Sequence, residues 1–510
     1  MNALQPAARS QPLSIVIVGA GFAGVGMAIR LRQVGITDFV ILEKAASVGG
    51  VWRDNTYPGA ACDVPSHLYS FSFERRFHWS RVYAEQPDIH RYIRHCFDKY
   101  RLASHLKLGT EVKRARFDEA AALWRIETTA GATLQARILI SATGQLNRPA
   151  YPDIPGLGDF SGKVFHSARW DHDCDLRGKR VAVIGTGASA IQFVPELVRK
   201  AAKVHLFQRS AAYVMPKLDH PFSNLQHRLF DAVPLLYGVA RAAVYLAYES
   251  LGVGFLRWRP AMRPMRAAAA WNLNRAVKDP ELRRKLTPDY PIGCKRVLFS
   301  NDYYPALAKP NAEVVTTGID SIGRDHVRTA DGQSYEVDAI VLGTGFAAND
   351  LLAPMDLVGR GGARLKDVWR SGPEAYLGIT VSGFPNLFML YGPNTNLGHN
   401  SIIYMLESQI RYVMQAVKRL RASPGTYLDV KPEAQSSFNR QLQQTLGRTV
   451  WSEGCRSWYM NAQGKIINNW SGFTFSYRRL TRALELSHYE IVDTTRTFDS
   501  NQLELATEQA

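Results

Sequence analysis

The chain contains the segment Ser14-Ile-Val-Ile-Val18, which continues directly as Gly19-Ala-Gly21-Phe-Ala-Gly24. A short run of β-branched apolar residues that ends in glycines and passes into an apolar helical pattern is typical of a buried parallel strand followed by a helix. In a G-x-G-x-x-G turn, the first glycine makes the turn and the second lets a pyrophosphate approach the backbone. The third glycine lets strand and helix pack closely. The segment therefore predicts a dinucleotide-binding unit close to the N-terminus.

The same plan recurs in Arg180-Val-Ala-Val-Ile184, which continues as Gly185-Thr186-Gly187-Ala-Ser-Ala190. Ala190 replaces the third glycine, and alanine is tolerated at this packing position. The helix that follows should point its unpaired N–H groups at the phosphates of a ligand. We expect contacts to that ligand from Thr186 in the turn and from Gln192 in the first helical turn. The chain thus predicts two dinucleotide sites.

The residue at the end of the second strand distinguishes the two sites. At equivalent positions, 24 residues after the first glycine of each unit, the chain has Glu43 and Arg209. A carboxylate there accepts hydrogen bonds from ribose hydroxyls, as in FAD or NAD, whereas a cation pairs with the 2′-phosphate of NADPH. Ser210 and Lys295 are further candidates for that phosphate. The sequence predicts FAD at the first site and NADPH at the second; solvated strand ends are the alternative for both residues.

Two further features indicate how the domains are arranged. The segment 148–156 is rich in Pro and Gly and predicts an extended linker, and apolar strands end at Gly144 and again at Gly345. We expect the chain to leave a first domain after Gly144 and to return near Gly345. The predicted fold is α/β, with two Rossmann-like dinucleotide-binding domains and a helical insertion. The expected division is FAD-binding domain 1–150 and 346–510, the latter with C-terminal substrate-side loops, NADPH-binding domain 151–216 and 291–345, and helical insertion 217–290.

Composition narrows the class of protein further. The net charge is +17, but the basic residues are scattered along the chain and no nucleic-acid-binding motif is present, so we expect a basic surface and no nucleic-acid partner. A chain of 510 residues can bury enough core to need no disulfide or metal. The five cysteines form no C-x-x-C pair, which argues against a zinc ribbon or a redox dithiol. Scattered cysteines suit a reducing cytoplasm, which is the expected location. No metal-ligand motif is present.

No membrane-spanning segment is expected. Residues 1–14 lack the apolar stretch of a signal peptide. The most apolar segment, 232–256, is interrupted by Arg241 and Glu249, and it therefore falls short of the roughly 18 uncharged residues of a membrane span. We favour a helical lid packed on the core for this region. The neighbouring Arg257-Trp258-Arg259 leaves peripheral contact with a membrane surface as the alternative.

Two longer motifs carry a family resemblance. Phe160-Ser-Gly162-Lys-Val-Phe-His166-Ser-Ala-Arg-Trp170-Asp171 resembles the fingerprint F-x-G-x-x-x-H-x-x-x-W-[PD] of type I Baeyer–Villiger monooxygenases. Gly49-Gly50-Val-Trp52-Arg-Asp-Asn-Thr-Tyr-Pro-Gly-Ala-Ala-Cys-Asp63 is similar to a second pattern of that family, which includes Trp52 beside the flavin site. Together with the glycine turns, the resemblance extends over essentially the whole chain. Related monooxygenases of amines and sulfides usually end the first motif in Tyr or Phe, so Trp170 favours the Baeyer–Villiger type.

The resemblance implies an enzyme in which NADPH reduces FAD and O2 then forms a C4a-peroxyflavin. That species inserts one oxygen atom beside a ketone carbonyl, which gives an ester or a lactone. Family correspondence also implies Arg296, in Gly293-Cys-Lys-Arg296, and Asp63 as the catalytic pair. A permanently charged guanidinium stabilises developing oxyanions, and a carboxylate partner holds it in place. A plain domain-tethering ion pair is the alternative for these two residues, and an N- or S-oxygenating enzyme is the alternative activity.

The resemblance assigns three further segments. Trp458 is similar to a family tryptophan that approaches NADP and substrate from a mobile loop; a core aromatic is the alternative. The segment 391–400 should line the flavin ring, with Asn394 and Asn396 offering polar contacts. His166 and Trp170 suggest a hinge between the nucleotide domains rather than direct catalysis. The ketone's identity and the oligomeric state have no signature in the chain.

Overall fold

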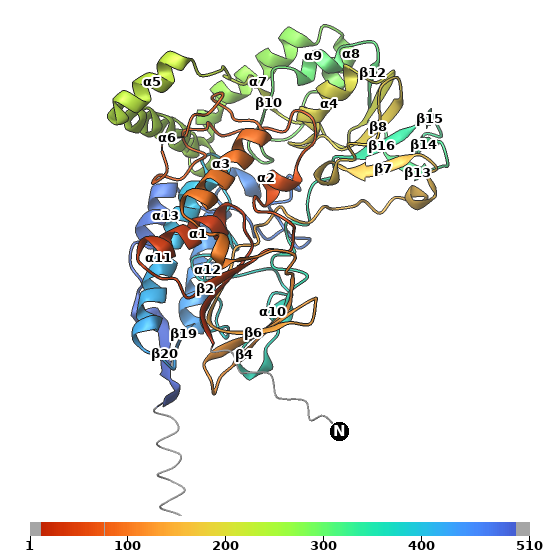
Figure 1. The fold of residues 1–510 in the computed structure, drawn as a ribbon. Helices are drawn as coiled ribbons and strands as arrows, with labels where there is room; N and C mark the ends of the chain where they lie inside the picture. The colour runs from red at the N-terminus through yellow and green to blue at the C-terminus, as the bar shows by residue number, and fades with distance from the viewer. Residues whose placement is uncertain (1–11, 76, 496–510) are drawn as a thin grey trace, which may run out of the picture.

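The computed structural model describes residues 12–75 and 77–495 (Figure 1). Residues 1–11, within the opening stretch for which the sequence predicts no signal peptide, lie outside the described residues, as do Arg76 and residues 496–510. The described chain forms two parallel-centred sheets and a group of helices that lies apart from the first sheet (Figure 1).

The first sheet has eight strands, and its centre is parallel. Alternate residues of its strands point to opposite faces, so Ile15 and Ile17 pack under the helices while Val16 and Val18 face the other side. Because both faces are covered at the centre, β1 and β2 are almost entirely apolar. Its strands are β1 (Leu13–Val18), β2 (Phe39–Leu42), β3 (Leu106–Lys107), β4 (Val112–Asp118), β5 (Leu123–Thr128), β6 (Thr133–Ser141), β17 (Asp356–Val358) and β18 (Leu387–Met389). The helices over one face include α1 (Phe22–Gln33), α3 (Gln86–Lys99) and α11 (Ile402–Ala422).

The second sheet has five parallel strands in the order β12-β9-β8-β16-β7. They are β7 (Lys163–His166), β8 (Arg180–Ile184), β9 (Lys203–Phe207), β12 (Ala312–Val315) and β16 (Ala339–Leu342). Helices α4 (Ala190–Val198) and α9 (Tyr303–Leu307) cover one face. The small antiparallel sheet of β13 (Ile319–Ile322), β14 (His326–Thr329) and β15 (Ser334–Glu336) covers the other.

Two chain segments cross between the sheets side by side. The outgoing segment follows β6 and the returning segment follows β16. The backbone N–H of Ala150 donates to the carbonyl of Gly345 over 2.9 Å, and that of Ala347 donates to the carbonyl of Arg148 over 2.9 Å. These bonds form a two-stranded connection that any relative movement of the two sheets must bend.

The helical insertion contains α5 (Asn224–Ala232), α6 (Pro234–Leu256), α7 (Arg263–Ala276) and α8 (Pro280–Lys285), and it occupies the top of the molecule in Figure 1. By length and composition, α6 alone among the described helices could cross a membrane. The two charges that interrupt its apolar sequence are both used inside the protein. Arg241 donates to the carbonyls of His67 and Ser70, and Glu249 is buried.

The remaining elements are short or lie in the C-terminal part: α2 (Val51–Asp54), β10 (Val214–Met215), β11 (Leu298–Phe299), α10 (Leu365–Val368), β19 (Thr426–Val430), α12 (Pro432–Leu446), α13 (Thr474–Leu480) and β20 (Tyr489–Asp493). The predicted α/β fold with two Rossmann-like units and a helical insertion is confirmed. Its two decisive strands are β1 and β8, which lie at the centres of separate sheets.

Candidate active site

A cavity of about 1290 Å³ lies at the carboxyl ends of β1, β2, β8 and β9. One small ligand typically needs about 300–1000 Å³, so this cavity is large enough for more than one. Apart from the segment 391–400, sixteen residues are predicted to bind a cofactor or to take part in catalysis, and fourteen of them line this cavity. They are Gly19, Gly21, Glu43, Trp52, Asp63, Gly185, Thr186, Gly187, Gln192, Arg209, Ser210, Lys295, Arg296 and Trp458.

The other two, Gly24 and Ala190, do not line the cavity but pack the helices onto the strands. A Cβ at Gly24 would overlap the carbonyl oxygen of Gly19 in the turn below. Gly19 itself has a φ of +106°, which side chains disfavour, and a Cβ there would lie 2.7 Å from the Ala142 carbonyl oxygen. Ala190 is fully buried, and its methyl group lies close to Gly343. The backbone N–H groups of Gly19 and Ala20 donate to the Leu42 carbonyl and to Glu43, so the N–H groups left for a ligand are those in the first turn of α1.

Glu43 is held rigidly at the end of β2. Its two carboxylate oxygens accept the backbone N–H groups of Ala20, over 2.9 Å, and Ala45, over 3.0 Å. Arg53 forms an ion pair with it at 3.2 Å. A carboxylate offers about four lone-pair positions, so this one still has capacity for ribose hydroxyls. Arg53 also lines the cavity; the sequence analysis quoted it within a motif but gave it no role.

Arg209, Ser210 and Lys295 lie near the end of β9, and each carries a group that can bind an anion. The ammonium of Lys295 donates to the hydroxyl of Ser210 over 2.8 Å and lies 4.4 Å from the centre of the Tyr290 ring. Thr186 donates its hydroxyl to the carbonyl of Ser210 over 3.0 Å. Burial and the nearby Arg209 guanidinium lower the pKa of Lys295 below its usual value. Two cations that destabilise each other in this way form a site that a phosphate would stabilise.

Arg296 and Asp63 form a bidentate ion pair at the cavity wall. The Nε of Arg296 donates to Oδ2 of Asp63, and Nη2 donates to Oδ1, both over 2.8 Å. Their side chains are 31% and 23% exposed, and the exposed surface faces the cavity that both residues line. Asp63 raises the pKa of Arg296 well above its usual value, so the guanidinium stays charged at every working pH.

Two tyrosines adjoin this ion pair. Tyr391 lines the cavity and donates its hydroxyl to Oδ1 of Asn396 over 2.7 Å. Tyr459 is fully buried, and burial raises its pKa to about 12, so it stays a neutral phenol beside Arg296. The sequence analysis missed Tyr459, although its position next to Trp458 was an available signal.

The predicted aromatic residues are held by nearby side chains, whereas Gln192 is held by residues of the other unit. Trp458 packs on the Tyr459 ring with 4.6 Å between centroids, and Trp52 donates its indole N–H to the Tyr69 hydroxyl over 3.1 Å. Gln192, on α4 of the second unit, accepts a hydrogen bond from the Tyr57 hydroxyl over 2.9 Å. It also donates to the carbonyl of Ala61 over 2.9 Å. Gln192 therefore joins the two nucleotide units beside the cavity.

The expectation for Asn394 is wrong. Its side-chain amide donates to the carbonyls of Ile466, over 2.9 Å, and Asn469, over 3.1 Å, and it does not line the cavity. Asn394 has a φ of +54°, so it serves the backbone turn rather than a ligand. Asn396, two residues further, does line the cavity.

His166 lies outside the cavity, beneath the crossing segments. It is fully buried, its Nδ1 accepts the backbone N–H of Ala168 over 3.0 Å, and its ring packs against Tyr151 and Phe346. Burial lowers its pKa to about 4, so the imidazole is neutral. The neutral ring of His166 is buried where the crossing segments meet, as expected of a structural residue. Its role in a hinge stays a prediction.

The cysteines require a correction. No need for a disulfide was predicted from a chain long enough to bury its core, yet Cys294 and Cys455 are bonded. Their Cα atoms lie 6.2 Å apart although 161 residues separate them in the chain. Tertiary folding alone brings them together. The bond joins the loop of Lys295 and Arg296 to the loop of Trp458, and neither cysteine lines the large cavity.

Thiol titration checks this disulfide. We expect three reactive thiols in the denatured, unreduced protein, from Cys62, Cys96 and Cys174, and five after reduction. Purification without reductant preserves the native state of the cysteines, and denaturation in the presence of the thiol reagent prevents disulfide exchange. Five thiols before reduction would contradict the disulfide.

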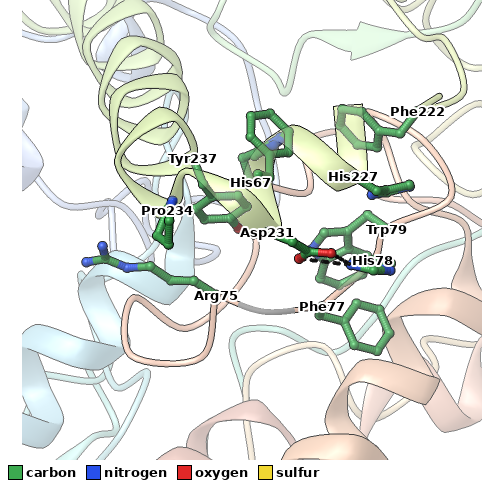
Figure 2. A pocket seen from close by; sticks show the side chains of 11 residues that line it. His67, Arg75, Phe77, His78, Trp79, Phe222, His227, Asp231, Pro234 and Tyr237 are labelled. Atoms are coloured by element: carbon green, nitrogen blue, oxygen red, sulfur yellow. Dashed lines mark hydrogen bonds and ion pairs between the residues drawn. The ribbon is translucent and has the colours of Figure 1, made fainter. Parts of the chain in front are cut away.

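A second, much smaller cavity of about 130 Å³ lies where the helical insertion meets the first domain (Figure 2). Its wall includes His67, His78 and Trp79 from the first domain and His227 and Asp231 from α5. It shares no lining residue with the large cavity and is too small for a dinucleotide. We assign it to the attachment of α5, not to the site.

Comparison with known proteins agrees with this geometry. Residues 16–220 match the family described as "Pyridine nucleotide-disulphide oxidoreductase". The chain is 48% identical to a Baeyer–Villiger monooxygenase of Pseudomonas aeruginosa, over 97% of this chain and 94% of that protein. It is 47% identical to a Baeyer–Villiger monooxygenase of Streptomyces coelicolor, over 94% of this chain and 92% of that protein.

Solved structures give the same result. An oxidised steroid monooxygenase bound to NADP superposes with a TM-score of 0.84 at 32% identity, covering 95% of this chain and all of the other (100%). A closed cyclohexanone monooxygenase superposes with a TM-score of 0.83 at 27% identity, over 95% and 100% of the two chains. With near-complete coverage by relatives that are almost half identical, the chain belongs to the Baeyer–Villiger monooxygenases, the FAD- and NADPH-dependent enzymes that insert one oxygen atom from O2 beside a ketone carbonyl.

Proposed function

We propose that Arg296 is the catalytic cation of this chain, that Asp63 positions it, and that the substrate is a ketone bound in the large cavity. The observation that carries the proposal is the bidentate Asp63–Arg296 pair, part of whose surface faces that cavity. Such a guanidinium keeps its charge and its direction throughout a reaction. It can therefore stabilise negative charge on the carbonyl oxygen of the substrate as the reaction proceeds.

We assign FAD to the first glycine turn. The turn at Gly19 and Gly21 presents free backbone N–H groups at the start of α1, which has no side-chain cap and no acidic residue in its first turn. Glu43 is placed to receive the ribose hydroxyls of the cofactor, and Trp52 borders the same part of the cavity. When bound and reduced, FAD supplies the reaction with O2 that transfers one oxygen atom to the ketone.

We assign NADPH to the second glycine turn. Gly185, Gly187 and the start of α4 suit a pyrophosphate, while Arg209, Ser210 and Lys295 suit the 2′-phosphate. Gln192 and Trp458 come from separate parts of the chain and border the space between the two assigned cofactors. We propose the cytoplasm, where NADPH is available, as the location of the enzyme.

The experiment that tests this function is a ketone panel with the purified, yellow holoenzyme. Linear, aryl, cyclic and steroid ketones are supplied with NADPH, and products are identified by mass. We expect at least one ketone to give an ester or lactone at one product per NADPH consumed. The matched amines and sulfides serve as the comparison. If only N- or S-oxides form, or if every ketone gives hydrogen peroxide alone, the proposal is wrong.

A further inference from the structure

Exposed apolar side chains are concentrated on one part of this molecule. Of the twenty large apolar residues that are exposed within the described chain, eleven fall between Leu218 and Trp271. The helical insertion, residues 217–290, therefore carries more than half of these exposed residues, although it makes up only about a seventh of the sequence. Contiguous exposed apolar surface of this kind marks an interaction site or an aggregation liability, whereas single exposed residues need no explanation.

Helix α6 has its polar and apolar faces reversed relative to an ordinary surface helix. Its charged residues face inward: Arg241 donates to the carbonyls of His67 and Ser70, and Glu249 accepts the backbone N–H and hydroxyl of Thr474. Its outward residues recur every three or four positions and contain no charge. They are Leu235, Leu236, Val239, Ala242, Ala243, Leu246, Ala247, Ser250 and Val253.

Helix α5 is also attached through polar side chains, although Arg228 on this helix is exposed. In Figure 2, His227 and Asp231, one turn apart on α5, point toward the first domain, where Asp231 pairs with His78 at 3.0 Å. The His227 and His78 rings stack with 4.7 Å between centroids. Leu225 and Leu229, also one turn apart, are exposed. Polar contacts thus anchor both helices, and their apolar sides are left free.

The end of α6 carries aromatic and cationic side chains. Trp258 is 61% exposed, and Arg257 beside it continues the outward stripe of the helix. Among the described residues, no ion pair or side-chain hydrogen bond engages Arg257, Arg263 or Arg266, whereas Arg259 pairs with Glu453. Tryptophan and arginine next to an apolar helical face are the groups that bind at the interface of an anionic bilayer.

We propose that the outward side of α5 and α6, together with Arg257 and Trp258, docks on an anionic lipid bilayer. We call this surface the α5–α6 face. The net charge of +17 attracts anionic lipid, while it opposes the pairing of two copies through this face. The helix lies in the interface and does not cross the membrane, because its inward charges are bound to the protein.

Docking in this orientation places the bilayer next to the catalytic cavity. On the inward side of α6, Glu249 accepts a hydrogen bond from the side-chain amide of Asn400, which lines the cavity together with Leu397. One helix thickness therefore separates the lipid from the cavity wall. An apolar ketone dissolved in the membrane would be concentrated at that wall; this consequence, unlike the docking, rests on the proposed function.

Vesicle sedimentation tests the docking with the full-length holoenzyme. Vesicles of phosphatidylcholine with about one third phosphatidylglycerol are compared with vesicles of phosphatidylcholine alone. We expect the wild type to bind the anionic vesicles at least tenfold more tightly and to lose that preference in high salt. The variant Leu235→Glu/Val239→Glu/Leu246→Glu should bind at least tenfold more weakly than the wild type. A second variant, Arg257→Glu, should lose much of the preference for anionic lipid.

The matched control places three glutamates at exposed apolar positions elsewhere, Leu108→Glu/Val368→Glu/Leu486→Glu, and it should bind like the wild type. Flavin content and far-UV circular dichroism confirm that each variant folds, and sedimentation velocity gives the oligomeric state. The proposal is overturned if the wild type ignores anionic vesicles, or if the two triple variants bind them equally. It is also overturned if the wild type is a dimer that does not bind vesicles and the triple variant of the α5–α6 face is a monomer. Ketone turnover plays no part in these readouts, so a failed ketone panel leaves them interpretable.

Discussion

Arg296→Ala is expected to lower the rate of ketone oxidation by roughly 10²–10³-fold, the usual cost of removing one preorganised oxyanion donor. Reduction of the flavin by NADPH should continue, because Arg296 is held by Asp63 at the cavity wall and the contacts that we propose for NADPH come from other residues. Stopped-flow absorbance measures flavin reduction, and product analysis measures oxygen transfer. The ratio of hydrogen peroxide to ester should rise accordingly.

Two further variants separate charge from geometry. Arg296→Lys keeps a cation but loses the bidentate contact with Asp63, so we expect partial activity, above that of the alanine variant. Asp63→Asn removes the charge that orients Arg296, and it should lower kcat more than it raises the KM for ketone. If Arg296→Ala retains full ketone turnover, or loses flavin reduction to the same extent as oxygen transfer, the assigned role is wrong.

Lys295→Ala is expected to lower kcat/KM for NADPH by roughly 10–100-fold, since a hydrogen bond to a charged group contributes about 1.5–3 kcal/mol. The same variant should leave kcat/KM for NADH almost unchanged, because NADH has no 2′-phosphate. Arg209→Ala should likewise lower kcat/KM for NADPH and leave kcat/KM for NADH almost unchanged. Steady-state kinetics with the two nucleotides measures the effect, and equal losses with both would contradict a phosphate site.

The pH dependence gives an independent check on this cluster. Burial and Arg209 lower the pKa of Lys295, so its charge is lost at a lower pH than that of an ordinary lysine. The KM for NADPH should therefore begin to rise on the alkaline side before an ordinary lysine titrates. Arg209→Ala removes one of the two causes, and the alkaline rise should then move to higher pH.

Local patterns in the sequence determined much of the fold. The strands at 13–18 and 180–184 and the glycine turns after them are visible, because strand, turn and helix each leave a signal within about ten residues. Glu43 and Arg209 could be predicted because each lies 24 residues after the first glycine of its unit. Outside the segment 391–400, fourteen of the sixteen predicted residues converge on one cavity, and the two exceptions, Gly24 and Ala190, pack helix against strand, which is the role of the third position.

What only the tertiary structure decided depends on contacts between distant segments. Asn394 faces the C-terminal segment instead of the cavity, and Tyr459 lies beside Arg296. Cys294 meets Cys455 across 161 residues. The orientation of α6 was also decided by the tertiary structure. Its sequence shows two charges in an apolar helix, but only packing reveals that both charges face inward. A short sequence pattern reports the period of a helix or strand and the residue types on it, whereas the neighbour that each face meets is set by the path of the whole chain.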